Sequence, residues 1–193
     1  MPTLQRVPAL VASGQLAIPV AEALVALPAD VLERIEAAPI DPDLADTAAF
    51  SEAYGFPVEG GANCIVVAGK RGDDVRYAAC IVLAHTRLDV NRVVKKLLDV
   101  RKASFAPMDQ AVELTGMEYG GITPIGLPPS WPVFVDSRVQ HAPEVVIGAG
   151  VRGAKLFLPG AVLAGLPHAQ VVDGLATEPT AATEPTAPSE SGA

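Results

Sequence analysis

Residues 64–83 read CIVVAGKRGDDVRYAACIVL, and this stretch decides how the chain is expected to fold. Its two ends, residues 64–68 and 77–83, are short runs of β-branched and small apolar residues. The polar segment GKRGDD (69–74) lies between them, and two such runs joined by a polar, glycine-containing connection are typical of a β-hairpin. The sequence therefore predicts an antiparallel pair of strands in the middle of the chain.

Further elements are predicted on both sides of this hairpin. Asp89 is expected to cap a helix whose apolar positions are Val90, Val93, Val94, Leu97 and Leu98. Other helices are predicted over residues 19–27, 44–54, 107–115 and 161–166, and other strands over residues 133–136, 144–148, 155–158 and 170–172. Residues 31–38 fit either a strand or a helix. Because strands outnumber helices and do not alternate strictly with them, the predicted class is α+β.

The composition restricts the class of protein. Of the 193 residues, 22 are Asp or Glu and 14 are Lys or Arg, so the formal net charge is -8. Nonspecific coating of nucleic acid needs a dominant cationic surface and is therefore excluded. Two cysteines are too few for a disulfide scaffold, and no apolar run reaches the ~20 residues of a membrane helix. No signal peptide is evident, so a cytoplasmic protein with no membrane partner is expected.

Three parts of the chain are expected to differ in structure. Residues 177–193 read TEPTAATEPTAPSESGA, and such a segment cannot bury enough apolar surface to offset its chain entropy. The sequence therefore predicts a disordered tail over residues 176–193 and a folded domain over residues 40–175. Residues 1–39 are weakly patterned at their start and are expected to form a peripheral extension that packs on this domain.

The loop MEYGGITPIGLPPSWP (117–132) is the most unusual stretch. It combines Gly120, Gly121 and Gly126 with four prolines, so flexible and rigid residues are mixed. A fixed loop of this kind can present main-chain N–H and C=O groups to a small polar ligand or an oxyanion. An ordinary surface connection is the alternative that the residues leave open.

Several familiar sites are not supported. The string GAGVRG (148–153) matches GxGxxG, but a strand rather than a long helix is expected after it, so a tight turn is favoured over a dinucleotide site. The three histidines lack metal-ligand spacing, and no serine lies in a GxSxG turn. Cys64 and Cys80 are interpreted as adjacent buried thiols on the two arms of the hairpin. No metal and no cofactor are expected.

One segment has the opposite charge to the rest of the chain. Residues 85–102 contain six Lys or Arg and two Asp, which gives a local charge of +4. Arg92, Lys95 and Lys96 are expected on the side of their helix opposite the valines. A solvated polar face is the simpler interpretation, and the alternative is a patch that docks one phosphate-bearing molecule.

Four pieces of the sequence, taken in this order, resemble the YbaK/EbsC family, which includes the editing domain inserted in bacterial prolyl-tRNA synthetases. They are ANCIVV (62–67), KASFAPMDQAVELTGMEYGGITPIGLP (102–128), WPVFVDSRV (131–139) and EVVIGAGVRGAKLFLPGAVL (144–163). The similarity covers roughly residues 40–175. Its most specific part is the run from Glu113 to Pro124, which includes the GxxxP loop of the family as GGITP (120–124).

The resemblance implies a mixed, mostly antiparallel, partly closed β-sheet with flanking helices. It also implies an aminoacyl-tRNA deacylase that hydrolyses the ester of misacylated tRNA, with a positioned water and the ribose hydroxyl of the tRNA in place of a protein nucleophile. The implied catalytic residues are Asn63, Gly121 and Asp136. The implied substrate-binding residues are Gly120, Ile122, Thr123, Pro124, Gly148 and Gly150, and Arg92, Lys95 and Lys96 are expected to meet phosphates near the acceptor end of the tRNA.

Asn63 departs from the family pattern. The family has a lysine in a KTLVV-like strand, where it holds the 3′-terminal nucleotide, and this chain has NCIVV at residues 63–67. An amide can hydrogen-bond a phosphate or ribose oxygen but carries no charge, and charge-assisted bonds are roughly twice as strong. A catalytically silent aminoacyl-tRNA or small-ligand binding module is therefore the alternative function, and a plain oligomerisation domain is a third.

Two further positions keep two interpretations each. Asp136 is either a polar group at the pocket rim, where it orients a water or an amine, or a cap for the turn at Ser137. Thr123 is either a hydroxyl inside the pocket or a simple turn residue.

Overall fold

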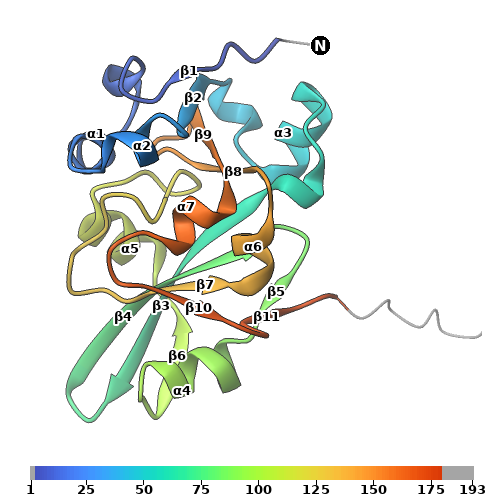
Figure 1. Cartoon of the computed structure of the whole chain (residues 1–193). Coiled ribbons are helices and arrows are strands. Elements are labelled where there is room, and N and C mark those ends of the chain that lie inside the picture. Colours follow the sequence, from blue (N-terminus) through green and yellow to red (C-terminus); the bar gives the residue numbers. More distant parts are fainter. Residues whose placement is uncertain (1–2, 180–193) are drawn as a thin grey trace, which may run out of the picture.

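In the computed structural model, which describes residues 3–179, the strands form two larger sheets and one short pair (Figure 1). The five-stranded sheet has the order β10-β7-β4-β3-β6, the four-stranded sheet has the order β1-β2-β9-β8, and β11 pairs with β5. The strands are Val7–Pro8 (β1), Glu36–Pro39 (β2), Ala62–Arg71 (β3), Asp74–Leu83 (β4), Arg87–Leu88 (β5), Lys102–Phe105 (β6), Val133–Asp136 (β7), Val145–Gly148 (β8), Ala154–Leu158 (β9), Ala169–Val172 (β10) and Ala176–Thr177 (β11).

The strand pairing confirms a mixed and mostly antiparallel α+β fold. The pairs β7–β4 and β7–β10 are parallel, and the other pairs of named strands in the described residues are antiparallel. The two larger sheets are open, and a single parallel bridge between Gly61 and Val146 joins them. This bridge brings the start of β3 next to β8.

The helices flank these sheets and are short. They are α1 (Ile18–Val25), α2 (Ala29–Leu32), α3 (Thr47–Tyr54), α4 (Lys95–Leu97), α5 (Met108–Thr115), α6 (Ser137–His141) and α7 (Gly160–Ala164). The chain also makes the single turns η1 (Ser13–Gln15), η2 (Pro42–Leu44) and η3 (Val58–Gly60), and η4 (Val90–Val94), which has π-type hydrogen bonding. The helix expected after Asp89 is therefore η4 continued by α4, and the Asp89 carboxylate caps it by accepting from the Arg92 N–H.

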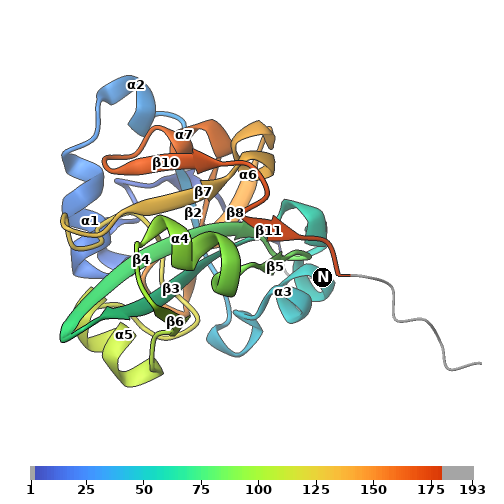
Figure 2. The same cartoon turned by 90° about the horizontal axis from the view of Figure 1, so that it is seen from below.

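The hairpin that the sequence predicts is present and longer than expected. Its strands are ten residues each, because the connection is only Gly72 and Asp73, and Gly72 has the positive φ of +63° that a two-residue turn needs. Gly69 and Asp74, expected in the connection, belong to the strands. Figure 2 shows α4 crossing the strands of this hairpin.

The cysteine prediction requires a correction. Cys64 is paired with Ile81, and Cys80 is paired with Ile65. Directly opposed residues share a face of the sheet and neighbours along a strand alternate, so the two thiols point to opposite faces. Cys64 packs against the core cluster that contains Ile81, and Cys80 belongs to the cluster around Val94 and Leu98.

The N-terminal segment is part of the main core rather than peripheral. Ala9, Val20, Leu24 and Ile35 are buried in one cluster with residues of β4, β7, β8 and β9. The ambiguous residues 31–38 divide between the end of α2 and β2, and β2 pairs with β9 inside the four-stranded sheet. Within residues 3–39, the expected extension therefore contributes two strands, β1 and β2, and buried side chains to the domain.

The tail is predicted to begin at residue 176, and this start is too early. Ala176 is buried, and Ala176–Thr177 pair with Arg87–Leu88 as β11. The disorder predicted for the remaining residues falls mainly on 180–193, which lie outside the described part of the chain. Among the helices of residues 3–179, none is long and apolar enough to cross a membrane.

Candidate functional site

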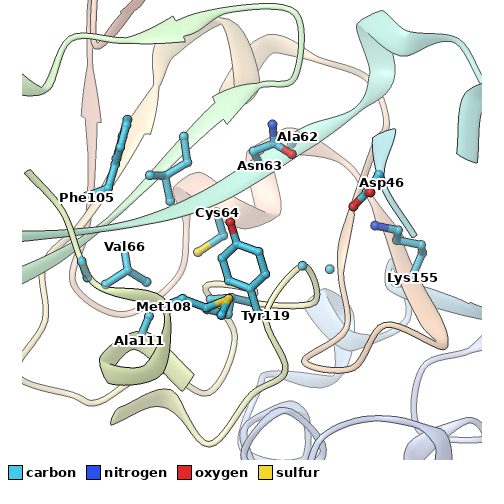
Figure 3. A pocket seen from close by; sticks show the side chains of 15 residues that line it. Asp46, Ala62, Asn63, Cys64, Val66, Phe105, Met108, Ala111, Tyr119 and Lys155 are labelled. Atoms are coloured by element: carbon cyan, nitrogen blue, oxygen red, sulfur yellow. The ribbon is translucent and has the colours of Figure 1, made fainter. Parts of the chain in front are cut away.

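A cavity of about 420 Å³ lies between the first half of β3, helix α5, the loop after α5, and the ends of β8 and β9 (Figure 3). Its wall is largely apolar, with a few polar groups at separate positions. The lining residues are Asp46, Ala62, Asn63, Cys64, Ile65, Val66, Phe105, Ala106, Met108, Ala111, Tyr119, Gly120, Ile122, Gly148 and Lys155. A volume of this size and a lining of this kind are typical of small-molecule sites.

The cavity lies at the edge of β3 because β6 pairs with only part of that strand. The β3–β6 register runs from Val67 to Lys70, so within residues 3–179 the edge of residues 62–65 has no strand partner on this side. Figure 3 shows Asn63 and Phe105 on one side of β3, and Cys64 and Val66 on the other. The cavity therefore has access to both faces of the strand at this edge.

The loop after α5 forms one wall and is held by its own backbone. The Gly121 N–H donates to the Glu118 carbonyl at 2.9 Å, and the Gly121 carbonyl accepts from the Gly150 N–H at 2.7 Å. The Glu118 N–H donates to the Gly150 carbonyl at 2.8 Å. These bonds fasten the loop to the turn between β8 and β9, and Tyr119, Gly120 and Ile122 face the cavity from it.

Two main-chain N–H groups of this wall make no hydrogen bond within the described residues. In residues 3–179, the main-chain N–H groups of Gly120 and Ile122 donate to no other protein group. Gly120 has a φ of +83°, a conformation that favours glycine. The Gly121 N–H, by contrast, already donates to the Glu118 carbonyl.

A lysine and an aspartate lie at one end of the cavity. Lys155 comes from β9, is 9% exposed, and has its Nζ 5.9 Å from the centre of the Phe50 ring. Asp46 precedes α3, and its carboxylate makes an ion pair at 3.6 Å with Arg152 rather than with Lys155. Burial lowers the pKa of Lys155 to about 8, although Asp46 acts in the opposite direction.

Cys64 is the one thiol in the cavity wall. Burial, assisted by the neighbouring Cys80, raises the pKa of the Cys64 thiol above its ordinary value. A thiol with a raised pKa stays protonated near neutral pH, whereas the nucleophilic form is the thiolate. Cys64 is therefore a packing residue of the wall, and no Ser, His or Lys hydrogen-bonded to it activates it in the described residues.

Of the residues that the sequence singles out, four meet at this cavity: Asn63, Gly120, Ile122 and Gly148. Gly121 and Gly150 lie directly behind the wall, in the hydrogen bonds described above. Thr123 is fully buried and its N–H faces the Met117 sulfur, while its hydroxyl has no partner among the described residues. Pro124 lines a separate depression with Trp131 and residues of α1.

Asp136 has a different environment from the pocket rim. It is 1% exposed and caps α6 by accepting from the Arg138 N–H at 3.0 Å. It also accepts from Arg138 Nε at 2.8 Å and from the Ala176 N–H at 3.0 Å. Burial alone raises the pKa of this carboxyl, but these hydrogen bonds outweigh it and hold the pKa below its ordinary value. The geometry therefore corrects the pocket-rim interpretation and supports the capping role, extended by a tie to β11.

The basic residues of segment 85–102 do not line the cavity. Arg87 and Arg92 line a second groove with Ser104 and Phe105, and Phe105 also lines the cavity. Lys95 and Lys96 are exposed but line neither. Across residues 3–179, no group of three His, Cys, Asp or Glu is arranged to hold a metal ion.

The fold and the site define an α+β domain with a ligand-sized cavity at the edge of its central hairpin. A family model described as the aminoacyl-tRNA editing domain matches residues 41–166. The chain therefore belongs to the aminoacyl-tRNA editing domain family, which confirms the resemblance to the YbaK type inferred from the sequence.

Solved structures show the same fold at low sequence identity. One, described as "a putative trans-editing enzyme for prolyl tRNA synthetase", is 23% identical with a TM-score of 0.69, and the match covers 84% of this chain and 97% of that chain. A protein described only as hypothetical is 24% identical with a TM-score of 0.60, over 70% and 84% of the two chains. A signal transduction protein, also described as putative, from Marinobacter aquaeolei VT8 is 16% identical with a TM-score of 0.52, over 81% and 30%.

Lys155, Asp46 and Tyr119 line the cavity but are absent from the sequence-based prediction. A lysine inside the apolar strand AKLFL (154–158) is a signal that could have identified Lys155, since buried lysines are rare without a partner. Asp46 has no such signal, because its position depends on how α3 packs beside β9.

Proposed function

We propose that this chain hydrolyses the ester bond between an amino acid and a tRNA on which it was wrongly placed, acting on the tRNA in trans. The observation that carries the proposal is the meeting of Asn63, Gly120, Ile122 and Gly148 in one cavity. These residues come from three separate pieces of the family pattern. Their convergence at a ligand-sized space supports a common role in holding the aminoacyl end of the tRNA.

The wall supplies groups for ester hydrolysis without a protein nucleophile. The free N–H groups of Gly120 and Ile122 are suited to stabilise the oxyanion that forms when water attacks the ester carbonyl. The Cys64 thiol stays protonated, so the attacking group is a bound water, and the ribose hydroxyl of the tRNA helps to position it. The protein therefore contributes binding, orientation and oxyanion stabilisation.

Asn63 is assigned to the 3′-terminal nucleotide. Its amide lies at the unpaired edge of β3, where it can donate to a phosphate or ribose oxygen and accept from a ribose hydroxyl. The exposed ring of Phe105 lies on the same side of β3 in Figure 3 and offers a surface on which the terminal base can stack.

The direct test is a deacylation assay with purified protein on a panel of mischarged tRNAs, with release of the amino acid as the readout. Hydrolysis of at least one mischarged tRNA above a buffer control is expected, and Asn63→Ala should slow it by about tenfold, the loss of roughly one hydrogen bond to a charged group. Absence of hydrolysis above buffer on every tRNA of the panel would sink the enzymatic proposal.

A binding module without catalysis is the second candidate, because Asn63 stands where the family has lysine. Asn63→Lys separates the two. A gain of hydrolysis in this variant, with none in the wild type, favours a chain that has lost its chemistry. A loss of hydrolysis favours a working asparagine.

A further inference from the structure

Lys155 is the cationic residue of the cavity wall and is not used by the function proposed above. Of the described residues that line the cavity, one is a lysine and none is an arginine or histidine. The strand β9 directs Ala154 and Leu156 into the main core, so Lys155 faces the other side of the sheet, toward α3. Figure 3 shows its ammonium end turned toward Asp46 at the end of the cavity.

The protein offers few groups that offset the unfavourable burial of the Lys155 ammonium group. Asp46 and Arg152 are the charged groups that face it: no carboxylate oxygen of residues 3–179 lies within 4.0 Å of Lys155 Nζ, and Asp46 is paired with Arg152 instead. The Phe50 ring, at 5.9 Å, is a weak partner. A buried cation without a close counter-charge is unfavourable in the free protein.

A ligand with an anionic oxygen would supply the missing partner. The aminoacyl end of a tRNA contains two such groups, the phosphodiester on the 5′ side of the terminal nucleotide and the ester carbonyl as it becomes an oxyanion. Asn63 carries no charge, so it cannot neutralise either one. Lys155 lies next to Gly148 in the β8–β9 register, and Gly148 packs against the loop that carries Gly120 and Ile122. The lysine is thus close to the proposed oxyanion donors.

We propose that Lys155 binds an anionic oxygen of the aminoacyl nucleotide and supplies the positive charge that Asn63 lacks. This inference rests on the proposed function for its substrate class. It assigns a substrate-binding role to a residue of β9, a strand of the four-stranded sheet.

The test uses an amide analogue, 3′-(L-alanylamino)-3′-deoxyadenosine, with and without a 5′-phosphate. Alanine is chosen because its side chain is small enough for any aminoacyl cavity, and the amide resists hydrolysis. Calorimetry with the wild type, Lys155→Met and the control Lys70→Met gives the dissociation constants. Lys70 is an exposed lysine at the hairpin end of β3 and does not line the cavity.

Lys155→Met is expected to weaken binding of the phosphorylated analogue at pH 7 by tenfold or more, and Lys70→Met by less than twofold. A loss confined to the phosphorylated analogue identifies the phosphate as the partner. An equal loss with both analogues places Lys155 at the carbonyl oxygen, which is neutral in the amide and becomes anionic only during ester hydrolysis. Because removal of the ammonium group relieves its burial, Lys155→Met should unfold at an equal or higher temperature. A purely structural role of Lys155 predicts a lower one.

The pH dependence gives a second readout. Lys155 is charged below about pH 8, so wild-type affinity is expected to fall as the pH rises through 8, more steeply than in Lys155→Met. The amine of the analogue titrates in the same range, and the comparison between the two proteins removes its contribution. The double variant Asn63→Lys/Lys155→Met should regain affinity, because it returns a cation to the cavity.

Unchanged affinity in Lys155→Met, or no binding of either analogue to the wild type, overturns the inference. If Lys155→Met fails to fold, NMR of ¹³C-labelled lysine in the wild type decides: the pKa of Lys155 must rise when the analogue binds, and an unchanged pKa refutes the role. The outcomes are separable from those of the deacylation assay. Lys155-dependent binding without hydrolysis refutes only the enzymatic proposal, and hydrolysis unaffected by Lys155→Met refutes only this inference.

Discussion

Gly148 is a residue at which the four-stranded sheet and the cavity loop approach each other closely. A Cβ atom there would lie 2.2 Å from the Gly121 carbonyl oxygen and 2.7 Å from that of Ile122. Both are backbone atoms, so the loop must shift to admit a side chain. Gly148→Ala is expected to lower the free energy of unfolding by about 1–3 kcal/mol and to abolish binding of the alanylamino analogue. Urea denaturation and calorimetry measure the two effects.

Gly14 provides the matched control for this substitution. A Cβ atom at Gly14 meets nothing within 4 Å, so Gly14→Ala should change neither stability nor binding by a measurable amount. Equal effects of the two substitutions would contradict a steric role of Gly148 in seating the loop.

Asp136 gives a pH-dependent prediction at the same scale. Its hydrogen bonds hold the folded-state pKa below the ordinary value near 3.9. The carboxylate therefore stabilises the fold above about pH 4, and this contribution is lost as the pH falls through the lower folded-state pKa. Asp136→Asn should reduce the free energy of unfolding by about 2 kcal/mol at pH 7, and the difference from wild type should shrink toward pH 2.

Asp73→Asn, in the exposed hairpin turn, is the control, and its free energy of unfolding should equal that of the wild type. The same pH profile of stability in both variants would contradict the prediction.

At the scale of elements, β11 fastens the end of the described chain to β7 and α6. The Ala176 N–H donates to Asp136, and the Ala176 carbonyl accepts from Arg138 Nη2 at 2.6 Å. Two truncated chains test this, one that ends at Pro179 and one that ends at Leu175. The shorter chain should be less stable than the longer one by about 3 kcal/mol, because two hydrogen bonds to charged groups are lost. Melting curves that coincide would show that β11 contributes nothing.

The elements that the sequence predicts well are those with an internal pattern. β7 has the predicted bounds Val133–Asp136, and α5 ends at Thr115, just before Gly116, whose φ of +65° favours glycine. β2 and β6 have no such pattern. β6 (Lys102–Phe105) is a largely exposed edge strand, so its backbone is ordered by pairing with β3 rather than by burial of alternate side chains.

The same limit applies to the candidate site. Asn63, Gly120, Ile122 and Gly148 were predicted together because each belongs to a stretch with its own signature, and the structure brings them to one cavity. Lys155 and Asp46 reach that cavity only because α3 covers the outer face of β9, and no local pattern specifies which face a helix 100 residues away will cover. Thr123 lies beside the predicted residues in sequence yet is buried behind the wall, since the loop turns its side chain inward.

At the scale of the whole molecule, the chain is acidic but has a groove lined by basic residues. The chain carries a net charge of -8, yet a groove lined by Arg87 and Arg92 meets the cavity at Phe105. Such a junction suits a single nucleic-acid end that enters the cavity while the preceding phosphates lie along the groove. The acidic remainder opposes broader contact, so affinity for a tRNA should depend on a few phosphates.

Arg92 allows that arrangement to be tested by salt dependence. Its side chain is 87% exposed and lies 3.1 Å from Asp89, so Arg92→Gln removes a charge without disturbing the core. The slope of log affinity for an acceptor-stem minihelix with an amide-linked alanine, plotted against log salt concentration, should decrease in magnitude by about 0.7–0.9, the value for one phosphate contact. Affinity for the phosphate-free alanylamino analogue should not change, because Arg92 lies outside the cavity.

Three variants serve as controls. Lys95→Gln and Lys96→Gln should have smaller effects, since neither residue lines the groove. Arg34→Gln removes an equal charge from a distant exposed surface. Slopes that change equally in Arg92→Gln and Arg34→Gln would mean that only net charge matters, and the groove would then have no specific part in binding.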